Sequence, residues 1–275
     1  MDIQDTIKKD VTAALQEDVG EGDWTALLTD ENQQSEARIL SRSRAVIAGS
    51  AWFDAVFKQL DPNAYIQWSV HDGQSVAPNT QLCKISGKTR ALLTGERTAL
   101  NFLQSLSAVA TRTAEYVTAV QGTRAKILDT RKTLPGLRLA QKYAVKAGGG
   151  VNHRIGLYDG VLIKENHIAA LGGVRAALMK ARQLAPTGMM IQIEVETLSQ
   201  LDEALECGAK LILLDNMGLE ALRHAVQRTN GQAELEASGG ITMSNVRDIA
   251  LTGVDRISIG ALTKDIQSID LSMRF

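Results

Sequence analysis

The hydrophobic pattern of the chain is most regular from about residue 124 towards the C-terminus. Short apolar runs rich in Ile, Val and Leu alternate there with segments whose apolar residues recur every three to four positions. Such runs indicate strands buried on both faces, and the segments between them indicate amphipathic helices. The six runs are AKILDT (125–130), GVLIKEN (160–166), MIQIEVE (190–196), KLILLDN (210–216), AELEASGG (233–240) and DRISIGA (255–261).

This alternation of strand and helix predicts a parallel sheet covered by helices. The units recur at intervals of about 20 to 35 residues, which favours an α/β barrel, complete or incomplete. An open doubly wound sheet is the alternative, because periodicity alone does not show whether a sheet closes. Thr197 followed by Gln200 predicts a capping box at the start of one of the helices.

The first part of the chain has a different pattern, which predicts a mixed α+β domain. The expected helices are 5–17 and 51–60, and the expected strands lie within 35–50 and 64–87. A long amphipathic helix begins near TGERT at 94–98. We place the domain boundary inside this helix, with an N-terminal α+β domain over 1–107 and a parallel α/β barrel domain over 108–265.

Composition narrows the class of protein. Among 275 residues, 44% are hydrophobic and 22% charged, as in an ordinary globular protein. The 30 Lys and Arg nearly balance 31 Asp and Glu, which argues against a general nucleic-acid or membrane-surface binder. Cys83 and Cys207 lack a CxxC context, which indicates free thiols and no zinc site. We find no apolar run of roughly 20 residues and no signal peptide, and we expect a cytoplasmic protein.

One short segment nevertheless carries a local excess of positive charge. Between Arg131 and Lys164 there are seven Lys or Arg, together with His153 and three consecutive glycines, against one carboxylate, Asp159. In a nearly neutral protein this excess predicts a local anion-binding site. Arg138, Lys142 and Lys146 fall on the polar side of a predicted helix whose apolar face is Leu137, Ala140, Tyr143, Ala144 and Ala147. We interpret these three cations as solvated surface charges.

The ends of the six apolar runs carry most of the remaining chemistry. In chain order they are Asp129-Thr130-Arg131-Lys132, Lys164-Glu165-Asn166-His167, Glu194-Val195-Glu196, Asp215-Asn216, Ser238-Gly239-Gly240 and Ser258-Ile259-Gly260. Because active sites of α/β barrels lie at the carboxyl ends of the strands, we expect these groups to converge on one mouth.

The residue types at these ends indicate a site for a polyanion. Arg131, Lys132 and Lys164 supply positive charge, and a structural pairing of Glu194 or Asp215 with the lysines is compatible with function. The two Ser/Gly turns match the phosphate-binding loops of barrel enzymes. Carboxylates beside phosphate predict contacts to ribose hydroxyls or to a divalent metal such as Mg²⁺. His153 fits a structural and a functional role equally well.

Several motifs, taken together and in order, resemble those of the quinolinate phosphoribosyltransferase family. They are DTRKTLPGLR (129–138), AVKAGGGVNHRIGLYDGVLIKENHI (144–168), IEVET (193–197), LILLDNM (211–217), EASGGI (236–241) and DRISIGALT (255–263). EDVGEGDWT (17–25) and GERTALNFLQSLSAVAT (95–111) extend the likeness over nearly the whole chain.

The resemblance implies a reaction and an assembly. Family members join quinolinate to 5-phosphoribosyl 1-diphosphate, release diphosphate and CO₂, and yield nicotinate mononucleotide for NAD biosynthesis. The implied fold is an N-terminal domain followed by an incomplete α/β barrel, with the C-terminal segment 266–275 packed back on the first domain. The implied assembly is a homodimer. Mg²⁺ accompanies the phosphoribosyl diphosphate, and no organic cofactor is required.

The resemblance also implies roles for individual residues. Arg131, His153, Arg154 and Lys164, with the partner subunit's Arg97, would bind the two carboxylates of quinolinate, and Thr130 would join the substrate site. Lys132 would lie between the two substrates. Glu194 and Asp215 would face the ribose hydroxyls and Mg²⁺. The turns Ser238-Gly239-Gly240 and Ser258-Ile259-Gly260 would hold the 5-phosphate. The implied catalytic residues are Lys132, Lys164, Glu194 and Asp215.

Three alternatives compete with this function. A Schiff-base aldolase would use Lys164, but such a site needs one lysine rather than a cluster of cations. Nicotinate phosphoribosyltransferase takes a monocarboxylate, whereas Arg97, Arg131 and Arg154 together favour a dicarboxylate. The third alternative is a barrel that binds quinolinate without turnover. The sequence does not favour it, because both carboxylates and both Ser/Gly turns are present.

Overall fold

The computed structural model describes residues 2–275, which divide into two compact units. Unit 1 contains the residues up to Ala114 with Thr133–Gly149 and Ala261–Phe275, and unit 2 contains Glu115–Lys132 with Gly150–Gly260. The long helix α3 (Thr89–Ala119) contributes residues to both units. The division therefore differs from the boundary drawn at 107/108. Segment 133–149, assigned to the barrel domain by sequence, belongs to unit 1, where Ala140, Ala144 and Val145 join the apolar core.

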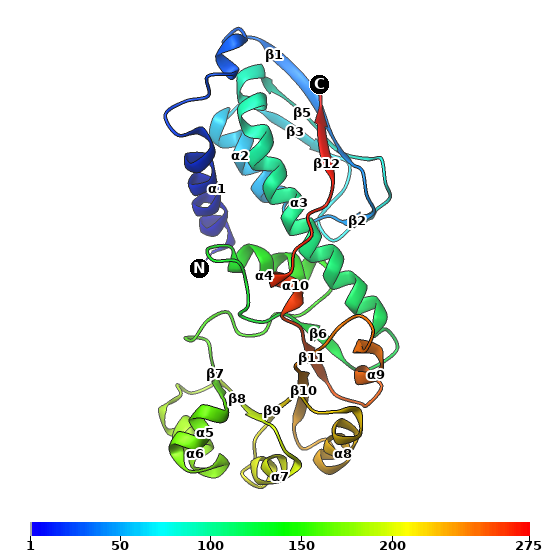
Figure 1. Cartoon of the computed structure of the whole chain (residues 1–275). Helices are drawn as coiled ribbons and strands as arrows, with labels where there is room; N and C mark the ends of the chain where they lie inside the picture. The colour runs from blue at the N-terminus through cyan, green and yellow to red at the C-terminus, as the bar shows by residue number, and fades with distance from the viewer. Residues whose placement is uncertain (1) are drawn as a thin grey trace. The chain divides into compact units, whose positions relative to one another are not determined.

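Unit 1 is built on an antiparallel sheet with strand order β12-β1-β5-β3. The strands are β1 (Gln34–Ser41), β3 (Tyr65–Trp68), β5 (Thr80–Lys88) and the C-terminal β12 (Leu271–Arg274), and β2 (Ala45–Val46) pairs separately with β4 (Ser75–Val76). Helices α1 (Ile3–Val19) and α2 (Ser50–Leu60) and the first part of α3 lie on one side of this sheet (Figure 1). A short 3₁₀ helix spans Ala26–Leu28. The mixed α+β pattern predicted for this region is confirmed.

Aromatic residues of α2 form the centre of the unit 1 core. Trp52, Phe53 and Phe57 are fully buried, and the ring of Phe53 packs edge-on against Phe57. The indole of Trp52 lies 5.3 Å from the ring of Tyr143 on α4 (Arg138–Ala147) and donates to Asp10 Oδ2 at 3.0 Å. Burying these large rings removes a large apolar area from water and contributes to the stability of this unit.

Unit 2 contains all six predicted strands in one parallel sheet, ordered β6-β11-β10-β9-β8-β7. They are β6 (Lys126–Leu128), β7 (Gly160–Ile163), β8 (Met190–Val195), β9 (Leu211–Asp215), β10 (Glu234–Ser238) and β11 (Arg256–Ser258). The first strand, β6, pairs with the last, β11, as barrel closure requires. It does not pair with β7 in the part of the chain described. The sheet is therefore an α/β barrel that is incomplete between β6 and β7.

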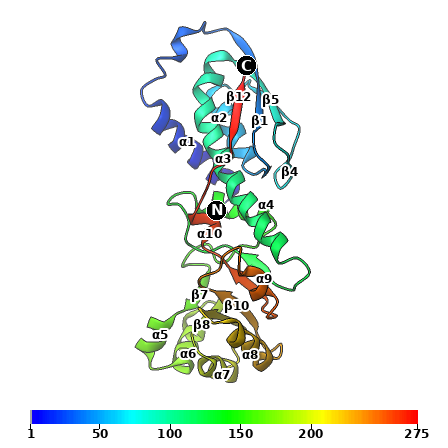
Figure 2. The ribbon, with the colours of Figure 1, turned by 45° about the vertical axis from the view of Figure 1, so that its right-hand side comes forward.

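The helices of unit 2 follow the strands in turn. They are α5 (Glu165–Leu171), α6 (Val174–Leu184), α7 (Leu198–Glu206), α8 (Leu219–Thr229) and α9 (Val246–Ala250). Figure 2 shows α5 to α8 along the outer face of the curved sheet. The predicted cap of α7 is present, because Thr197 Oγ1 accepts from the amide of Gln200 at 3.2 Å. The Gln200 side chain returns to the amide of Glu196, one residue before the cap.

One sequence-based interpretation is wrong in α4. Lys142, expected on a solvated face, is only 1% exposed, and Arg138 is half-buried, whereas Lys146 is exposed as predicted. The buried positions of α4 include Gln141 as well as the alanines, so they extend around most of the helix. Helical spacing identifies one apolar face but does not reveal that other faces are covered. The short helix α10 (Ala261–Lys264) lies nearby in unit 1, where Gln141 Nε2 donates to the carbonyl of Thr263.

Among the helices the structure describes, none is long and apolar enough to cross a membrane. Both cysteines are free thiols, as the sequence predicted, with Cys83 buried and Cys207 partly buried.

Candidate active site

A cavity of about 620 Å³ lies at the carboxyl ends of the unit 2 strands, and we call it the strand-end cavity. Its lining includes thirteen of the residues singled out from the sequence: Thr130, Arg131, Lys132, His153, Arg154, Lys164, Glu194, Asp215, Asn216, Ser238, Gly239, Gly240 and Ser258. Ile259 and Gly260 do not line it, since Ile259 is buried with its amide bonded to the carbonyl of Leu128. Arg97 lies on an exposed part of α3 in unit 1.

A lysine–glutamate pair joins two neighbouring strands at the mouth of this cavity. Lys164 follows β7, and its Nζ donates to Glu194 Oε2 on β8 at 3.1 Å and to Oε1 at 3.3 Å. Burial raises the pKa of Glu194, Lys164 opposes this rise, and the charges of Asp215 and Glu165 add to it. Glu194 is 7% exposed, whereas nearly half of the Lys164 side chain is open to solvent. The pair therefore keeps one cation available to a ligand.

Two arginines stand close together on the cationic side. Burial lowers the pKa of Arg154, Arg131 lowers it further by repulsion, and Asp159 opposes both effects. Arg154 Nη1 donates to the carbonyl of Gly160 at 2.8 Å, and Asp159 accepts from the amides of Ile155 and Gly156. The loop is thus held so that two mutually repelling guanidinium groups share one wall. An anion between them would relieve that repulsion.

Asn216 links Asp215 to the turn after β10. It adopts a left-handed conformation with φ 53°, its amide donates to the carbonyl of Ser238 at 2.9 Å, and its Nδ2 donates to Asp215 Oδ2 at 2.9 Å. A Cβ on Gly239 would lie 2.0 Å from Asn216 Oδ1, so glycine is required for this approach. Asn216 therefore couples the position of the glycine turn to the position of the Asp215 carboxylate.

The second Ser/Gly turn supports Lys132. A Cβ on Gly260 would lie 2.9 Å from Lys132 Cδ, so this glycine leaves room for the lysine stem. The amide of Lys132 donates to Thr130 Oγ1 at 3.0 Å. Gly260 thus contributes to the site by positioning Lys132, although it does not itself line the cavity.

Sequence reasoning missed the floor of the cavity. Leu162, Leu213 and Glu236 also line it, and Gln192 lies against Glu236. Gln192 precedes Glu194, and Glu236 precedes Ser238, by two residues on the same strand, which places each pair on one face. The available signal was a polar residue inside an apolar run. The strand-end rule considers only the residue where each run stops, so it does not select polar residues inside a run.

The carboxylates fit a shared metal site rather than an all-protein cage. Among residues 2–275, no three His, Cys, Asp or Glu are grouped so as to hold a metal ion. Glu194 and Asp215 are close enough for the charge of Asp215 to raise the pKa of Glu194. Mg²⁺ is commonly bound by one or two carboxylates together with substrate phosphates, and these two residues fit that pattern.

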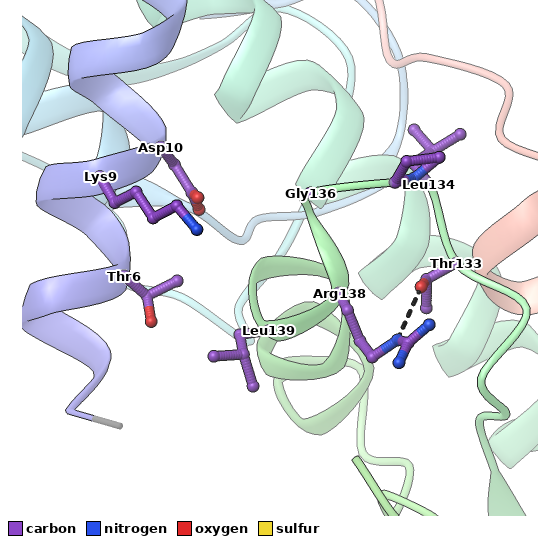
Figure 3. A pocket seen from close by; sticks show the side chains of 9 residues that line it. Thr6, Lys9, Asp10, Thr133, Leu134, Gly136, Arg138 and Leu139 are labelled. Carbon is purple, nitrogen blue, oxygen red and sulfur yellow. Dashed lines mark hydrogen bonds between the residues drawn. The ribbon is translucent and has the colours of Figure 1, made fainter. Parts of the chain in front are cut away.

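Unit 1 also has a cavity, of about 330 Å³, between α1 and the segment that leads into α4 (Figure 3). Lys9 and Asp10 come from α1, and Arg138 donates to Thr133 Oγ1 at 3.1 Å. Asp10 is turned towards Trp52, and burial raises its pKa against the effect of that hydrogen bond. None of the strand-end residues lines this cavity, so the cavity of unit 2 is the candidate active site.

Comparison with known proteins gives a consistent result. Residues 23–107 match the model of the quinolinate phosphoribosyl transferase N-terminal domain, and residues 109–274 match the model of its C-terminal domain. The chain is 43% identical to a probable nicotinate-nucleotide pyrophosphorylase [carboxylating] of Bacillus subtilis, over 97% of this chain and 92% of the relative. It is 38% identical to quinolinate phosphoribosyltransferase [decarboxylating] 1b of Nicotiana tabacum, over 98% and 82%.

A solved structure agrees with the sequence comparisons. The nicotinate-nucleotide pyrophosphorylase of Francisella tularensis superposes with a TM-score of 0.95 at 43% identity, covering 98% of this chain and 96% of the other. Both halves of the chain match in order and almost in full. The chain therefore belongs to the quinolinate phosphoribosyl transferase family.

Proposed function

We propose that the strand-end cavity is where this enzyme transfers phosphoribosyl from 5-phosphoribosyl 1-diphosphate to quinolinate. The products are nicotinate mononucleotide, diphosphate and CO₂. The observation that carries the proposal is the composition of one cavity, in which a cationic wall faces two carboxylates and a Ser/Gly turn. Those features match a dicarboxylate beside a phosphorylated sugar, and the family is one in which relatives are named for this reaction.

The cationic wall is the proposed site of quinolinate. Arg131 and Arg154 present planar guanidinium groups, which suit bidentate contacts to carboxylates. Two like charges that line the same cavity repel each other, which makes the cationic wall formed by Arg131 and Arg154 more favourable for a dianion than for a monoanion. Thr130, His153 and Lys164 complete this side of the cavity.

The part of the cavity formed by the ends of β8 to β11 is the proposed site of the phosphoribosyl donor. The turns after β10 and β11 would place backbone amides and the hydroxyls of Ser238 and Ser258 around the 5-phosphate. Glu194 and Asp215 would accept from the ribose hydroxyls and hold Mg²⁺ together with oxygens of the substrate. When bound, Mg²⁺ would supply charge neutralisation to the departing diphosphate.

The proposed reaction has two steps, and the charged residues of the cavity would stabilise the charge that develops in each. The pyridine nitrogen attacks the anomeric carbon as the bond to diphosphate breaks, and positive charge develops on the ribose. Glu194 and Asp215 are proposed to stabilise that charge, while the cationic wall holds the weak nucleophile in line. The carboxylate next to the quaternised nitrogen leaves as CO₂, its electron pair stays on the ring carbon, and a proton replaces it. Lys132 and Lys164 are proposed to stabilise the transient carbanion.

An assay with two possible acceptors tests this function. Purified protein is incubated with Mg²⁺, 5-phosphoribosyl 1-diphosphate and ring-labelled quinolinate, with nicotinate in a parallel reaction. We expect nicotinate mononucleotide and CO₂ from quinolinate alone. Product from nicotinate would move the assignment to the non-carboxylating reaction. Quinolinate binding without product would indicate a barrel that binds the ligand without turnover.

We further propose a homodimer in which the partner subunit's Arg97 completes the site, consistent with the exposure of Arg97 on α3. Two inactive variants, Arg97→Ala and Arg131→Ala, test the arrangement when unfolded and refolded together. Half of randomly assembled dimers would carry one intact site, so activity should recover to about a quarter of wild type. No recovery, with mixed dimers formed, would show that both residues serve the site of their own chain. A cytoplasmic location stays a prediction.

A further inference from the structure

Glu236 on the floor of the strand-end cavity has no role in the function proposed above. It is 1% exposed, yet it lines the cavity. Its Oε2 accepts from Gln192 Nε2 at 3.0 Å, whereas its Oε1 has no hydrogen-bond partner and lies 3.6 Å from His153 Nε2. A buried carboxylate with an oxygen in this state is costly, which calls for a reason to keep it.

Hydrogen bonds run in one direction from Arg154 to this carboxylate. The amide of Arg154 donates to His153 Nδ1 at 2.7 Å, and His153 Nε2 bonds to Gln192 Oε1 at 2.9 Å. Because Nδ1 accepts, the proton of the ring is on Nε2, and Gln192 must present its oxygen to that nitrogen. The amide group of Gln192 then faces Glu236 and requires an acceptor there.

Both ring nitrogens of His153 are therefore engaged within the protein. In this arrangement His153 offers no ring N–H to a ligand carboxylate, which differs from the role that resemblance implied. Its amide donates to Asp129 Oδ1 at 2.9 Å, so the backbone is held as well. Arg154, which follows His153 in the chain and whose amide donates to the fixed ring, lines the cavity.

We propose that Glu236 is a positioning residue that acts through Gln192 and His153 to hold the backbone of Arg154, and thereby sets the affinity of the cationic wall for the pyridine dicarboxylate. The inference rests on the proposed function of that wall. According to this inference, the buried Glu236 determines the orientation of Arg154, which contacts the substrate. Outer partners of this kind commonly change affinity by one to two orders of magnitude.

A carboxylate at position 236 presents acceptor oxygens in both directions. Its Oε2 accepts from the Gln192 amide, and its Oε1 lies 3.6 Å from His153 Nε2 without a hydrogen bond to it. A glutamine there has one oxygen and one NH₂ group, so a donor would face either Gln192 or His153. If the NH₂ group faced Gln192, Gln192 would have to flip and His153 to change tautomer, which removes the acceptor for the Arg154 amide; if it faced His153, two donors would lie against each other. The donor-to-acceptor order from Arg154 to position 236 thus depends on a side chain there that offers only acceptors.

A swap of the two side chains separates positioning from a direct role. Glu236→Gln alone should raise the KM and Kd for quinolinate on the order of 10- to 100-fold, the effect of one unpaired buried group. The KM for the phosphoribosyl donor should change by less than about threefold. The double variant Gln192→Glu/Glu236→Gln keeps an acceptor for His153 and a donor–acceptor pair between the two positions, so it should return the quinolinate KM to within about threefold of wild type.

A matched control is available on β10, and a second test variant is available on β8. Glu234→Gln makes the same chemical change two residues earlier, at an exposed residue paired with Arg256, and should leave both KM values unchanged. Gln192→Met, which keeps the Glu236 charge and breaks the link to His153, should reproduce the rise if Glu236→Gln does not fold. Melting temperature and circular dichroism report folding for every variant.

Each outcome discriminates. An unchanged quinolinate KM in folded Glu236→Gln would overturn the inference, as would a swap that stays as weak as the single variant, since that would place the charge itself in contact with ligand. Failure of the proposed function shows differently, because wild-type protein would then not convert quinolinate at all.

Discussion

The two units use carboxylates in their interiors for different ends. In unit 1 the carboxylates are turned to donors of the same unit: Asp61 accepts from the amides of Asn63 and Lys88, and Asp72 accepts from the amide of Gly49 and the hydroxyl of Tyr143. In unit 2, Glu194, Asp215 and Glu236 converge on a cavity.

The difference shows how burial is used. A carboxylate whose acceptors are filled by the protein stabilises local structure, as the half-buried Asp72 does by accepting from the amides at the start of α2. A carboxylate that shares an open cavity with cations retains the capacity to bind a ligand, as Glu194 does beside Lys164. Substitutions in unit 1 should therefore change the free energy of unfolding, and those in the cavity should change catalysis.

The largest expected effect is on catalysis, from Glu194→Gln. The variant keeps the shape but removes the anion that holds Lys164 and faces the ribose in the proposed complex. We expect kcat/KM to fall on the order of 10²- to 10³-fold with an unchanged melting temperature. Glu165→Gln, an exposed neighbour outside the cavity lining, is the control. Loss of stability with activity retained would contradict the contrast between the units.

A second expectation concerns the turn after β10. In Gly239→Ala the new Cβ would overlap Asn216, displacing the amide that orients Asp215. The KM for the phosphoribosyl donor should rise on the order of 10- to 100-fold, while that for quinolinate changes little. Gly240 also has a positive φ, 60° against 92° at Gly239, but open space around the Cβ position, so Gly240→Ala tests backbone strain without the collision. Equal effects from both variants would rule out the proposed role of Asn216.

A third expectation moves to the core of unit 1. Trp52→Phe removes the donor to Asp10, whose pKa is already raised by burial, and leaves that carboxylate less satisfied. Denaturant unfolding should show a loss of about 1–3 kcal/mol, with KM values unchanged in the folded protein. Trp24→Phe is the matched control because Trp24 is 81% exposed. A changed quinolinate KM in Trp52→Phe would contradict the expectation that substitutions in unit 1 affect stability and not catalysis.

The smallest expectation is a pH effect on stability. Burial raises the pKa of Asp54, the hydrogen bond from Trp68 opposes it, Asp72 raises it, and Lys58 lowers it. With a folded pKa above 3.8, the folded state binds this proton more tightly, so the contribution of Asp54 to stability is fully present below 3.8 and is lost as pH rises through the folded pKa. Asp54→Asn retains an acceptor for Trp68 and should raise stability at neutral pH by less than about 1 kcal/mol.

The sign of that effect is the test. The gain should disappear near pH 3, where both forms are neutral, and an exposed control, Glu31→Gln, should show no such dependence. A gain that persists at low pH would have another origin than the raised pKa.

Local pattern was sufficient for much of the fold. Each of the six apolar runs contains one strand of the parallel sheet, because a strand buried on both faces has a nearly continuous apolar sequence. The strand-end rule then located most of the cavity lining, since parallel strands bring their carboxyl ends to one edge. These features depend on short stretches of chain and on the shared direction of the strands.

Other features depend on which segments pack together, and only the tertiary structure decided them. The break of the barrel between β6 and β7 is a property of strand pairing. Lys142 is buried although its helical position indicated a solvated face, and Glu236 forms the cavity floor although its sequence context is a strand interior. Hydrophobic periodicity records which positions avoid water on average. It does not record the partner that each polar group finds, because that partner comes from a distant part of the chain and is fixed by packing.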